Sequence, residues 1–409
     1  MAKKIIVVGG GAAGMLAALF AARSGAGVAL LERNEKLGKK LYITGKGRCN
    51  LTNAAEKEPF MRHILRNPRF LYASLALLDN AKLMDLVESL GVPLKVERGE
   101  RVFPESDKAS DVNRALEREL RRLGVGIRLN ARAKEILVED GRCSGILLES
   151  GEKVAGDAVV LATGGVSYPM TGSTGDGHAL ARETGHAVTN LLPALVPVDT
   201  VETWPYALAG LTLKNVQLHA WSGKKRVFSE QGELLFTHFG ISGPLVLTLS
   251  SLLPEDLSDA RLSIDLKPAI DDGTLDQRLV RELRDNSRKA MSTVIDALAP
   301  HALGMALLEL AGISPAKPAN AITQEERKRL RMLFKNLPLT PKALRGFGEA
   351  VVTRGGVDVK HINPSTLESR LLPGLYFAGE LLDLDATTGG FNLQIAFSTG
   401  ALAGKSAAQ

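Results

Sequence analysis

Lys4-Ile-Ile-Val-Val-Gly9-Gly-Gly-Ala-Ala-Gly14 decides the fold of this 409-residue chain. The apolar residues before Gly9 predict a buried strand, the glycines predict a tight turn, and residues 15–23 predict a helix. Residues 28–31 predict a second strand, which closes a βαβ unit. This order indicates an α/β fold with a dinucleotide-binding turn at the edge of a parallel sheet.

The glycines of the turn follow the pattern G-x-G-x-x-G, and each has its own physical task. Gly9 permits the tight turn, Gly11 lets the backbone approach a pyrophosphate, and Gly14 lets the helix pack close to the strand. The first helical turn, which includes Ala12 and Ala13, would then offer its N–H groups to the phosphates.

An acidic residue ends the second predicted strand. Glu32 follows Gly14 by eighteen residues, and a carboxylate at this place can accept both ribose hydroxyls of an adenosine. The alternative is a glycine-rich turn beside an unrelated surface glutamate. That alternative leaves the joint presence of strand, helix, spacing and acid unexplained. The fingerprint by itself does not distinguish NAD from FAD.

Distant segments favour FAD over NAD. A strand-like run at 375–378 ends in Gly379 and Glu380, and Gly389-Gly-Phe-Asn-Leu-Gln394 opens a last predicted helix. A further loop, Ala162-Thr-Gly-Gly165, also follows a strand-like run. FAD needs such additional loops because its ribityl chain and isoalloxazine ring extend beyond the first βαβ unit. The carboxylate would bind a ribityl hydroxyl, and the helix N-terminus would face the flavin N1–C2=O region.

A second nucleotide fingerprint, which could seat NAD(P)H, is not evident in the sequence. Gly172-Ser-Thr-Gly-Asp-Gly177 has the wrong spacing, and no predicted strand precedes it. We therefore expect NAD(P)H to act as a transient electron donor over the flavin, with NADH and NADPH both open.

The composition is that of a globular protein of two or three domains, with 45% hydrophobic and 23% charged residues. Its two cysteines, Cys49 and Cys143, are too few for a disulfide framework or a cysteine zinc site. We expect no metal and a cytoplasmic location. The apolar run from Ile5 to Ala22 mimics a signal peptide or a membrane span, but the nucleotide turn explains its glycines better.

The sequence pattern changes near residue 191. Prolines at 193, 197 and 205 precede strand-like runs that are typical of a different, mostly antiparallel unit. Helical patterns follow from residue 274. The sequence thus predicts a FAD-binding domain split into residues 1–190 and 346–409. A β-rich module at 191–273 and a helical subdomain at 274–345 are expected to lie between its two parts.

The helical subdomain is expected to be strongly basic. Residues 274–345 contain thirteen Lys or Arg against seven Asp or Glu, an excess equal to the +6 of the whole chain. One interpretation is a surface that binds ribosomal RNA. The other is a set of solvated helix faces paired with nearby acids. The cations proposed to contact RNA are Arg278, Arg281, Arg288, Arg327, Lys328 and Arg331.

Three longer motifs are more specific than the glycine fingerprint. They are Gly45-Lys-Gly-Arg-Cys-Asn-Leu-Thr-Asn53, Leu235-Phe-Thr-His-Phe-Gly-Ile-Ser-Gly-Pro244, and Thr353-Arg-Gly-Gly-Val357 with Pro373-Gly-Leu-Tyr-Phe-Ala-Gly-Glu380. With Gly389–Gln394 they resemble, over essentially the whole chain, the bacterial NAD(P)/FAD-dependent oxidoreductase family that includes a bile-acid reductase and a ribosomal-RNA dihydrouridine synthase. The resemblance implies a glutathione-reductase-type FAD-binding Rossmann domain, with an inserted β-barrel-like module that carries a helical subdomain.

The resemblance also implies where the site residues lie. The loop from Arg48 to Asn53 would run along the flavin, and the His238 motif would border the space above it. Glu380 stands where many relatives have Asp, so Glu380 and Asp383 compete for the ribityl-binding role. The expected FAD-binding residues are Gly9, Gly11, Ala12, Ala13, Gly14, Glu32, Arg33, Lys40, Gly47, Arg48, Cys49, Asn50, Ala133, Ala162, Thr163, Gly164, Gly379, Glu380, Asp383, Gly390, Phe391, Asn392 and Leu393.

Three residues are candidates for catalysis. Cys49 could donate a proton, with its pKa tuned by the adjacent Arg48, or it could be a small buried side chain that only packs. His238 could donate a proton or bind a carbonyl, or it could hydrogen-bond backbone in a structural role. Arg48 could pair with a phosphate or with the reduced flavin.

The resemblance leaves several reactions open, because a fold does not fix a function. The first is dihydrouridine synthesis in ribosomal RNA, in which flavin N5 would deliver hydride to uracil C6 and an acid would protonate C5 of a base taken out of its stack. The second is reduction of a small bile-acid-like enone, or oxidation of an amine. The third is a flavin-bound protein that associates with RNA without turnover.

Overall fold

The computed structural model describes residues 2–409 and divides them into two compact units. Unit 1 comprises residues 2–194 and 347–409, and unit 2 comprises residues 195–346. The sequence placed the first boundary at 190/191. The structure places it after β11 (Leu192–Ala194), because this strand pairs with β19 (Val352–Arg354) of unit 1.

Unit 1 is built on a parallel five-stranded sheet in the order β20-β10-β1-β2-β6. The strands are β20 (Leu375–Phe377), β10 (Ala158–Leu161), β1 (Lys4–Val8), β2 (Gly27–Leu31) and β6 (Gly126–Arg128). The central strands are continuous apolar runs because helices cover both faces of the sheet. Val7, Leu30 and Leu161 have no exposed surface.

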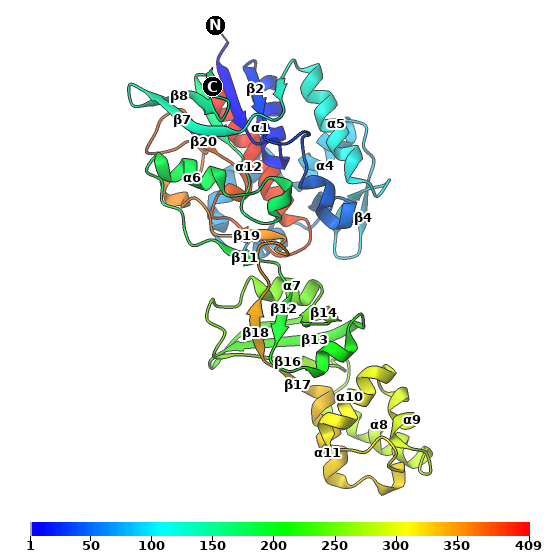
Figure 1. The fold of residues 1–409 in the computed structure, drawn as a ribbon. Helices are drawn as coiled ribbons and strands as arrows, with labels where there is room; N and C mark the ends of the chain where they lie inside the picture. The colour runs from blue at the N-terminus through cyan, green and yellow to red at the C-terminus, as the bar shows by residue number, and fades with distance from the viewer. Residues whose placement is uncertain (1) are drawn as a thin grey trace. The chain divides into compact units, whose positions relative to one another are not determined.

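Helix α1 (Ala12–Arg23) follows β1 as the sequence predicted and packs against α12 (Phe391–Ala408), the last helix of the chain (Figure 1). Two glycines of α12 permit this close approach. A side chain at Gly400 or Gly404 would overlap the backbone of Ala13 or Ala17 in α1. The C-terminal segment is thereby fixed against the nucleotide turn.

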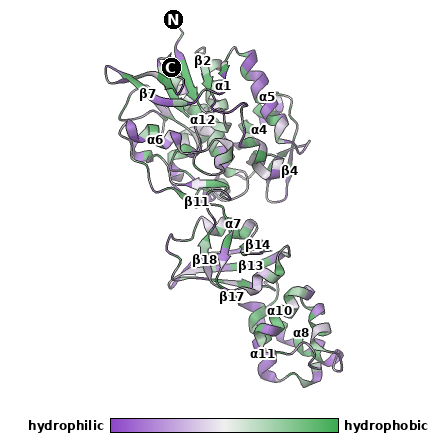
Figure 2. Ribbon diagram, viewed as in Figure 1, coloured by the Kyte–Doolittle hydropathy of each residue, from purple (hydrophilic) through white to green (hydrophobic). Residues whose placement is uncertain are grey.

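The other elements of unit 1 surround this core. Figure 2 shows many hydrophilic residues along α5. The helices are α2 (Lys57–Arg62), α3 (Tyr72–Leu77), α4 (Asn80–Ser89), α5 (Ala109–Arg122) and α6 (Asp176–Glu183). The small antiparallel sheets are β3 (Thr52–Asn53) with β5 (Arg101–Pro104) and β4 (Leu94–Glu97), and β7 (Ala133–Glu139) with β8 (Arg142–Leu148) and β9 (Lys153–Ala155). Short 3-10 helices are η1 (Leu41–Gly47), η2 (Pro68–Leu71), η3 (Pro169–Thr171), η7 (Val359–His361) and η8 (Gly379–Leu381).

Unit 2 contains a seven-stranded antiparallel sheet that curls toward a barrel. Its order is β17 (Leu337–Leu339), β16 (Ala260–Asp265), β13 (Thr212–Ser222), β14 (Lys225–Thr237), β15 (Gly240–Ser242), β12 (Val198–Thr200) and β18 (Pro341–Leu344). The two edge strands, β17 and β18, are separated in sequence by Thr340 alone. The sheet must therefore curve until its edges approach, since one residue cannot span a flat sheet of this width.

Helices occupy most of residues 274–345, the range in which the sequence predicted a helical subdomain. They share one hydrophobic core with the sheet, in which Leu218 and Phe236 of the strands join Leu279, Leu307 and Phe334 of the helices. The helices are α7 (Pro244–Ser250), α8 (Asp272–Asp285), α9 (Met291–Val294), α10 (His301–Ala311) and α11 (Gln324–Lys335), with η4 (Trp204–Leu208), η5 (Ile295–Ala297) and η6 (Ala319–Ala321).

Candidate functional site

The candidate site lies at the carboxyl-end edge of the parallel sheet in unit 1. Because the strands are parallel, the turn after β1, the loops after β10 and β20 and the end of β2 all leave the sheet at this edge. Backbone hydrogen bonds hold them together, since Ala162 N–H donates to Val8 O and Ala378 N–H donates to Leu161 O. The structure therefore brings together the loops that the sequence assigned to one cofactor.

The glycines of the nucleotide turn differ in their surroundings. Gly9 has φ +102°, and a side chain there would meet the Ala162 carbonyl. A side chain at Gly14 would overlap the carbonyl oxygen of Gly9. Gly11 has no protein atom within 4 Å of the place that its Cβ would occupy. This open space is where the fingerprint requires a pyrophosphate to approach.

Glu32 is fixed at the end of β2 and retains 6% of its surface. Its Oε2 accepts from the N–H of Gly10 at 2.7 Å. Its Oε1 accepts from the backbone N–H of Asn34 at 2.8 Å and from the Asn34 side chain at 2.7 Å. The carboxylate is thus oriented by the turn, and its remaining lone pairs suit ribose hydroxyls.

Glu380 is the most strongly held carboxylate of the site. Lys40 Nζ donates to its Oε2 at 2.5 Å, Ser167 Oγ donates to its Oε1 at 2.7 Å, and the Thr353 N–H donates to Oε1 at 2.8 Å. Burial acts to raise the pKa of Glu380. The charge of Lys40 and these hydrogen bonds outweigh it and leave the pKa below its usual range. Glu380 is therefore ionised at neutral pH.

The two candidates for the ribityl role lie in different surroundings. Glu380 follows Gly379, where a side chain would contact Ala13 of the nucleotide turn. Asp383 pairs with Arg66 at 2.9 Å, and only 9% of its side chain is exposed. The position next to the turn favours Glu380.

The loop after Arg48 meets the N-terminus of α12. Thr52 Oγ1 donates to Gln394 Oε1 at 2.6 Å, and Asn53 Nδ2 donates to the Gly389 carbonyl at 3.1 Å. In the amide orientation that satisfies both of its groups, Asn50 accepts from the Gly390 N–H at 3.1 Å. Two signature motifs more than 300 residues apart therefore form one wall.

Cys49 and Arg48 do not form the tuned pair that the sequence predicted. Cys49 has no exposed surface, and burial raises the pKa of its thiol to about 12. Arg48 forms ion pairs with Glu97 and with Asp107 (2.6 Å) and lies over the Phe103 ring. The prediction that Cys49 is a proton donor tuned by Arg48 is wrong, because its thiol is buried and Arg48 is already paired. Contact of this loop with FAD stays a prediction.

The burial of Cys49 leads to a prediction about thiol reactivity. A thiol with a pKa of about 12 is protonated at pH 8, so the native protein should react with a thiol reagent more than about 100-fold more slowly than a free cysteine. Cys143, also buried, has a thiol pKa raised to about 11. Labelling at pH 8 followed by peptide mass spectrometry checks this, with denatured protein as the control that should label both residues. Rapid labelling of native Cys49 would restore it as a candidate acid.

Two further expected residues lie close to Glu32. Arg33 donates to Thr174 at 2.5 Å and pairs with Asp176 at 2.8 Å, so it fastens the loop before α6. Ala133 begins β7 and is half-buried. The Ala131 N–H donates to the Glu32 carbonyl at 2.9 Å, which places this segment beside β2.

Sequence reasoning missed a buried polar group behind Glu380. His178 in α6 is 1% exposed, and neither ring nitrogen has a hydrogen-bond partner of good geometry within residues 2–409, although the Leu381 backbone lies close enough to favour its protonated form. The Thr163 hydroxyl is likewise buried without such a partner among these residues. Burial, with a smaller contribution from Arg182, lowers the pKa of His178 to about 4. No local pattern marks this histidine, because its surroundings include Glu380 and Leu381, about 200 residues away in sequence.

His178 should make the protein sensitive to acid. Its folded-state pKa of about 4 lies below the unfolded value of 6.5, so the unfolded state takes up the proton first and stability falls as the pH drops from about 6.5 to about 4. Between pH 8 and pH 5, we expect the free energy of unfolding of His178→Leu to fall by about 2 kcal/mol less than that of the wild type. Urea unfolding at both pH values measures this.

A matched variant separates this titration from packing. His186 is also buried with a pKa lowered to about 4, but its ring hydrogen-bonds Ser369 at 2.8 Å. His186→Leu should therefore lose more stability at pH 8 than His178→Leu, because it removes this hydrogen bond. Equal acid sensitivity in His178→Leu and the wild type would refute the assignment.

In unit 2, His238 is exposed in the turn between β14 and β15, and its ring contacts Phe239 at 4.9 Å between centroids. Its proposed place beside the flavin stays a prediction.

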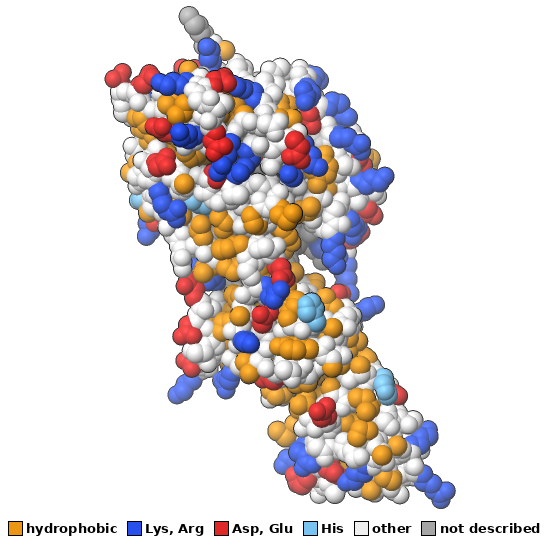
Figure 3. Space-filling model, in the orientation of Figure 1, with side chains coloured by type: hydrophobic (Ala, Val, Ile, Leu, Met, Phe, Trp, Pro, Cys, Tyr) orange, Lys and Arg blue, Asp and Glu red, His pale blue; other side chains and the backbone are white. Residues whose placement is uncertain are grey.

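The basic residues of the helices are less free than their count suggests. Arg327 pairs with Asp276 at 3.1 Å, Arg331 pairs with Asp272 at 3.2 Å, and Arg278 donates to the Ala297 carbonyl. Arg288 lies beyond the end of α8, so the arginine row does not continue along one helix. Figure 3 shows basic and acidic side chains interleaved over these helices. Of the six cations proposed to contact RNA, those without an ion-pair partner among residues 2–409 are Arg278, Arg281, Arg288 and Lys328.

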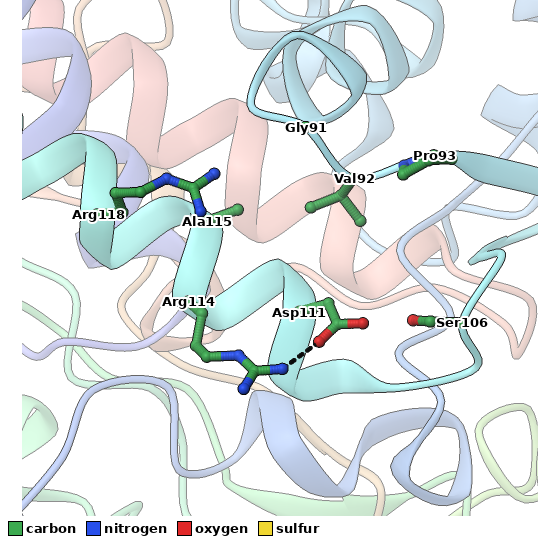
Figure 4. Close-up of a pocket in the computed structure, with 8 residues that line it drawn as sticks. All are labelled: Gly91, Val92, Pro93, Ser106, Asp111, Arg114, Ala115 and Arg118. Carbon is green, nitrogen blue, oxygen red and sulfur yellow. Dashed lines mark hydrogen bonds and ion pairs between the residues drawn. The ribbon is translucent and has the colours of Figure 1, made fainter.

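A groove of about 330 Å³ elsewhere in unit 1 does not include any expected cofactor residue. Its charged groups are already engaged: Arg114 pairs with Asp111, and Arg118 donates to the Leu90 carbonyl at 2.6 Å (Figure 4). The lining residues are Gly91, Val92, Pro93, Ser106, Asp111, Arg114, Ala115 and Arg118. Within residues 2–409 no cluster of His, Cys, Asp and Glu could hold a metal, and no helix is long and apolar enough to cross a membrane.

The site fits FAD on three structural observations. The space at Gly11 is open, and the Thr163 hydroxyl is a buried donor with no partner among the described residues. Helices α1 and α12 both begin at glycines, Gly11 and Gly390, without a side-chain cap and without an acid in the first turn. Two helix N-termini thus offer free N–H groups to an electron-rich cofactor.

Comparison with known proteins identifies the family. The HI0933-like protein Rossmann domain matches residues 3–406. The chain belongs to this family. It is 34% identical to the 3-dehydro-bile acid delta(4,6)-reductase of Clostridium scindens over 99% of each chain. It is 31% identical to a ribosomal RNA dihydrouridine synthase of Haemophilus influenzae over 96% of each chain.

A solved structure shares the fold. The 3-ketosteroid delta1-dehydrogenase from Sterolibacterium denitrificans superposes with a TM-score of 0.53 at 14% identity, covering 99% of each chain. The predicted fold class, a Rossmann-type FAD-binding domain with an inserted module, is confirmed, as is the family that the motifs indicated. The protein is an oxidoreductase of the FAD-dependent class.

Proposed function

We propose that this protein uses FAD, reduced by NAD(P)H, to saturate a carbon–carbon double bond conjugated to a carbonyl, and that its substrate is uridine in ribosomal RNA. The observation that carries the redox part is the convergence of the glycine turn, Glu32 and Glu380 at one sheet edge, with two uncapped helix N-termini beside them. FAD, when bound, supplies the hydride.

The chain's own residues would hold the cofactor in four places. The N–H groups after Gly11 would bind the pyrophosphate, and Glu32 would bind the adenosine ribose. Glu380, fixed by Lys40, would bind a ribityl hydroxyl. The first turn of α12, which begins after Gly390, would stabilise negative charge on the ring system.

The chemistry of the substrate follows from conjugation. A carbonyl makes the far carbon of the double bond electron-poor, so that carbon accepts hydride and the near carbon accepts a proton. Uracil offers this arrangement at C6 and C5. The chain's net charge of +6 supports a polyanionic substrate. The similarity to a protein named as a ribosomal RNA dihydrouridine synthase supports it as well.

A second candidate substrate is a small enone. It has the same double bond conjugated to a carbonyl, and two observations favour it. The relative named as a bile-acid reductase is 34% identical over 99% of each chain. In addition, the paired arginines of α11 reduce the charge available to RNA.

One experiment separates the two substrates. Ribosomal RNA from a strain lacking the gene is mapped for dihydrouridine and then incubated with the purified FAD-loaded protein and NADH or NADPH. The RNA proposal predicts one lost dihydrouridine in the strain and its return in vitro. An unchanged pattern in the strain refutes it. If the protein oxidises NAD(P)H in the presence of a steroid-type dienone and does not reduce RNA, the protein is an enone reductase instead.

A further inference from the structure

The outer face of the β13–β14–β16 sheet carries a tryptophan between two arginines. Along β13, Val216, Leu218 and Ala220 are buried in the core, while His219 and Trp221 are half-buried on the opposite face. This alternation follows from the period of two in a strand. An indole that remains partly exposed beside a complete core is available to a ligand.

Cross-strand pairing places cations on both sides of this indole. Trp221 lies opposite Arg226 of β14 and opposite Arg261 of β16. The Arg261 guanidinium lies over the indole, 6.0 Å from the ring centroid, and donates to the Gly223 carbonyl at 3.1 Å. The ring of His219 lies 5.8 Å from that of Trp221 along the same face.

The hairpin tip adds two lysines. Lys224 lies in the turn between β13 and β14, and Lys225 begins β14; both are exposed. We call Trp221, Lys224, Lys225, Arg226 and Arg261 the basic hairpin. None of its four cations has an ion-pair partner among residues 2–409. The helical arginines differ, because Arg327 and Arg331 are already neutralised.

We propose that the basic hairpin binds single-stranded RNA, with Trp221 stacking on an unpaired base and the four cations holding the adjacent phosphates. An exposed aromatic ring flanked by cations on a sheet face binds single strands because every base has a face to stack and every nucleotide has a phosphate. This inference rests on the proposed RNA substrate and assigns its docking surface to the sheet rather than to the helices.

The chain offers its own optical reporter. It contains two tryptophans, Trp204 and Trp221, and Trp204 packs against Phe236 at 5.7 Å between centroids. In the full-length FAD-loaded Trp204→Phe variant, Trp221 is the single tryptophan. Its emission should be quenched by a 20-nucleotide single-stranded RNA of mixed sequence. In Trp221→Phe the remaining tryptophan, Trp204, should be unaffected.

Charge reversal provides the second measurement. Lys224→Glu/Lys225→Glu/Arg226→Glu should weaken binding of the same RNA at least 10-fold and reduce the slope of log affinity against log salt by about 2. The matched control, Arg281→Glu/Arg288→Glu/Lys328→Glu, removes the same charge from the helices and should change affinity less than 3-fold. Retained FAD content and an unchanged melting temperature show that the variants are folded.

Contrary outcomes are distinguishable. If RNA binds the wild type but neither quenches Trp221 nor loses affinity on reversal of the hairpin, the docking surface is wrong and the proposed function stands. If RNA fails to bind the wild type at 50 mM salt, both the surface and the RNA substrate are refuted. Quenching of Trp221 by phosphatidylglycerol vesicles but not by RNA would assign the basic hairpin to a membrane surface and overturn the inference.

Discussion

Replacing Gly11 by alanine should lower the affinity for FAD by at least about 100-fold while leaving the apoprotein folded. Gly11 has φ −79° and ψ −169°, which alanine adopts freely, and no protein atom lies within 4 Å of the added Cβ. The methyl group would instead occupy the space that a pyrophosphate needs. The cost to folding should stay within about 1 kcal/mol, the usual difference at a helix N-cap. Titration of apoprotein with FAD and thermal melting measure the two quantities.

Two glycine variants control this prediction. Gly14→Ala would overlap the Gly9 carbonyl and should destabilise the apoprotein itself, by about 3 kcal/mol. Gly348→Ala, which adds a methyl group in open space outside the site, should change neither quantity. If Gly11→Ala binds FAD as tightly as the wild type, the turn after β1 does not hold the pyrophosphate.

Glu380→Gln should lower the free energy of unfolding by about 3 kcal/mol and weaken FAD binding in the same variant. The amide can still accept from Ser167 and Thr353, but it turns a donor toward Lys40, whose side chain is about four-fifths buried. An uncompensated cation at this burial is costly. Denaturant unfolding and FAD titration measure the two effects.

The pH dependence follows from the lowered pKa of Glu380. The stability that this carboxylate contributes is fully present above its unfolded pKa of about 4.5 and is lost as the pH falls through its folded pKa. The difference between the wild type and Glu380→Gln should therefore shrink below about pH 4. The double variant Lys40→Met/Glu380→Gln should recover part of the loss, since it removes both charges. Additive effects of the two changes would show that the pair is not coupled.

The nucleotide turn could be predicted because its signals are local. A run of apolar residues, glycines at fixed spacing and an acid after the next strand each depend on a few neighbouring residues. The structure places β1, α1 and β2 within a few residues of the predicted ranges. The returning loops at Ala162 and Gly379 were predictable for the same reason, since each follows a recognisable apolar strand.

The site chemistry was less accessible because it depends on partners far apart in sequence. Lys40 and Glu380 are 340 residues apart, and nothing local indicates that they meet. Cys49 is next to a cation in the sequence, but in the folded protein its thiol is buried and Arg48 forms ion pairs with Glu97 and Asp107. Desolvation and pairing are properties of the packed chain, so a pKa cannot be obtained from neighbours in sequence.

The sequence by itself determined that this protein has a dinucleotide turn, a returning C-terminal helix and a split domain. These features depend on hydrophobic periods and glycine spacings that involve only neighbouring residues. Only the tertiary structure decided which carboxylate is held beside the turn and which cations are free. Of the cations counted over residues 274–345, Arg327 and Arg331 are paired with Asp272 and Asp276, whereas the four cations around Trp221 have no ion-pair partner among residues 2–409. A charge count ignores geometry, and the free energy of an ion pair depends on the distance and the solvent between its two charges.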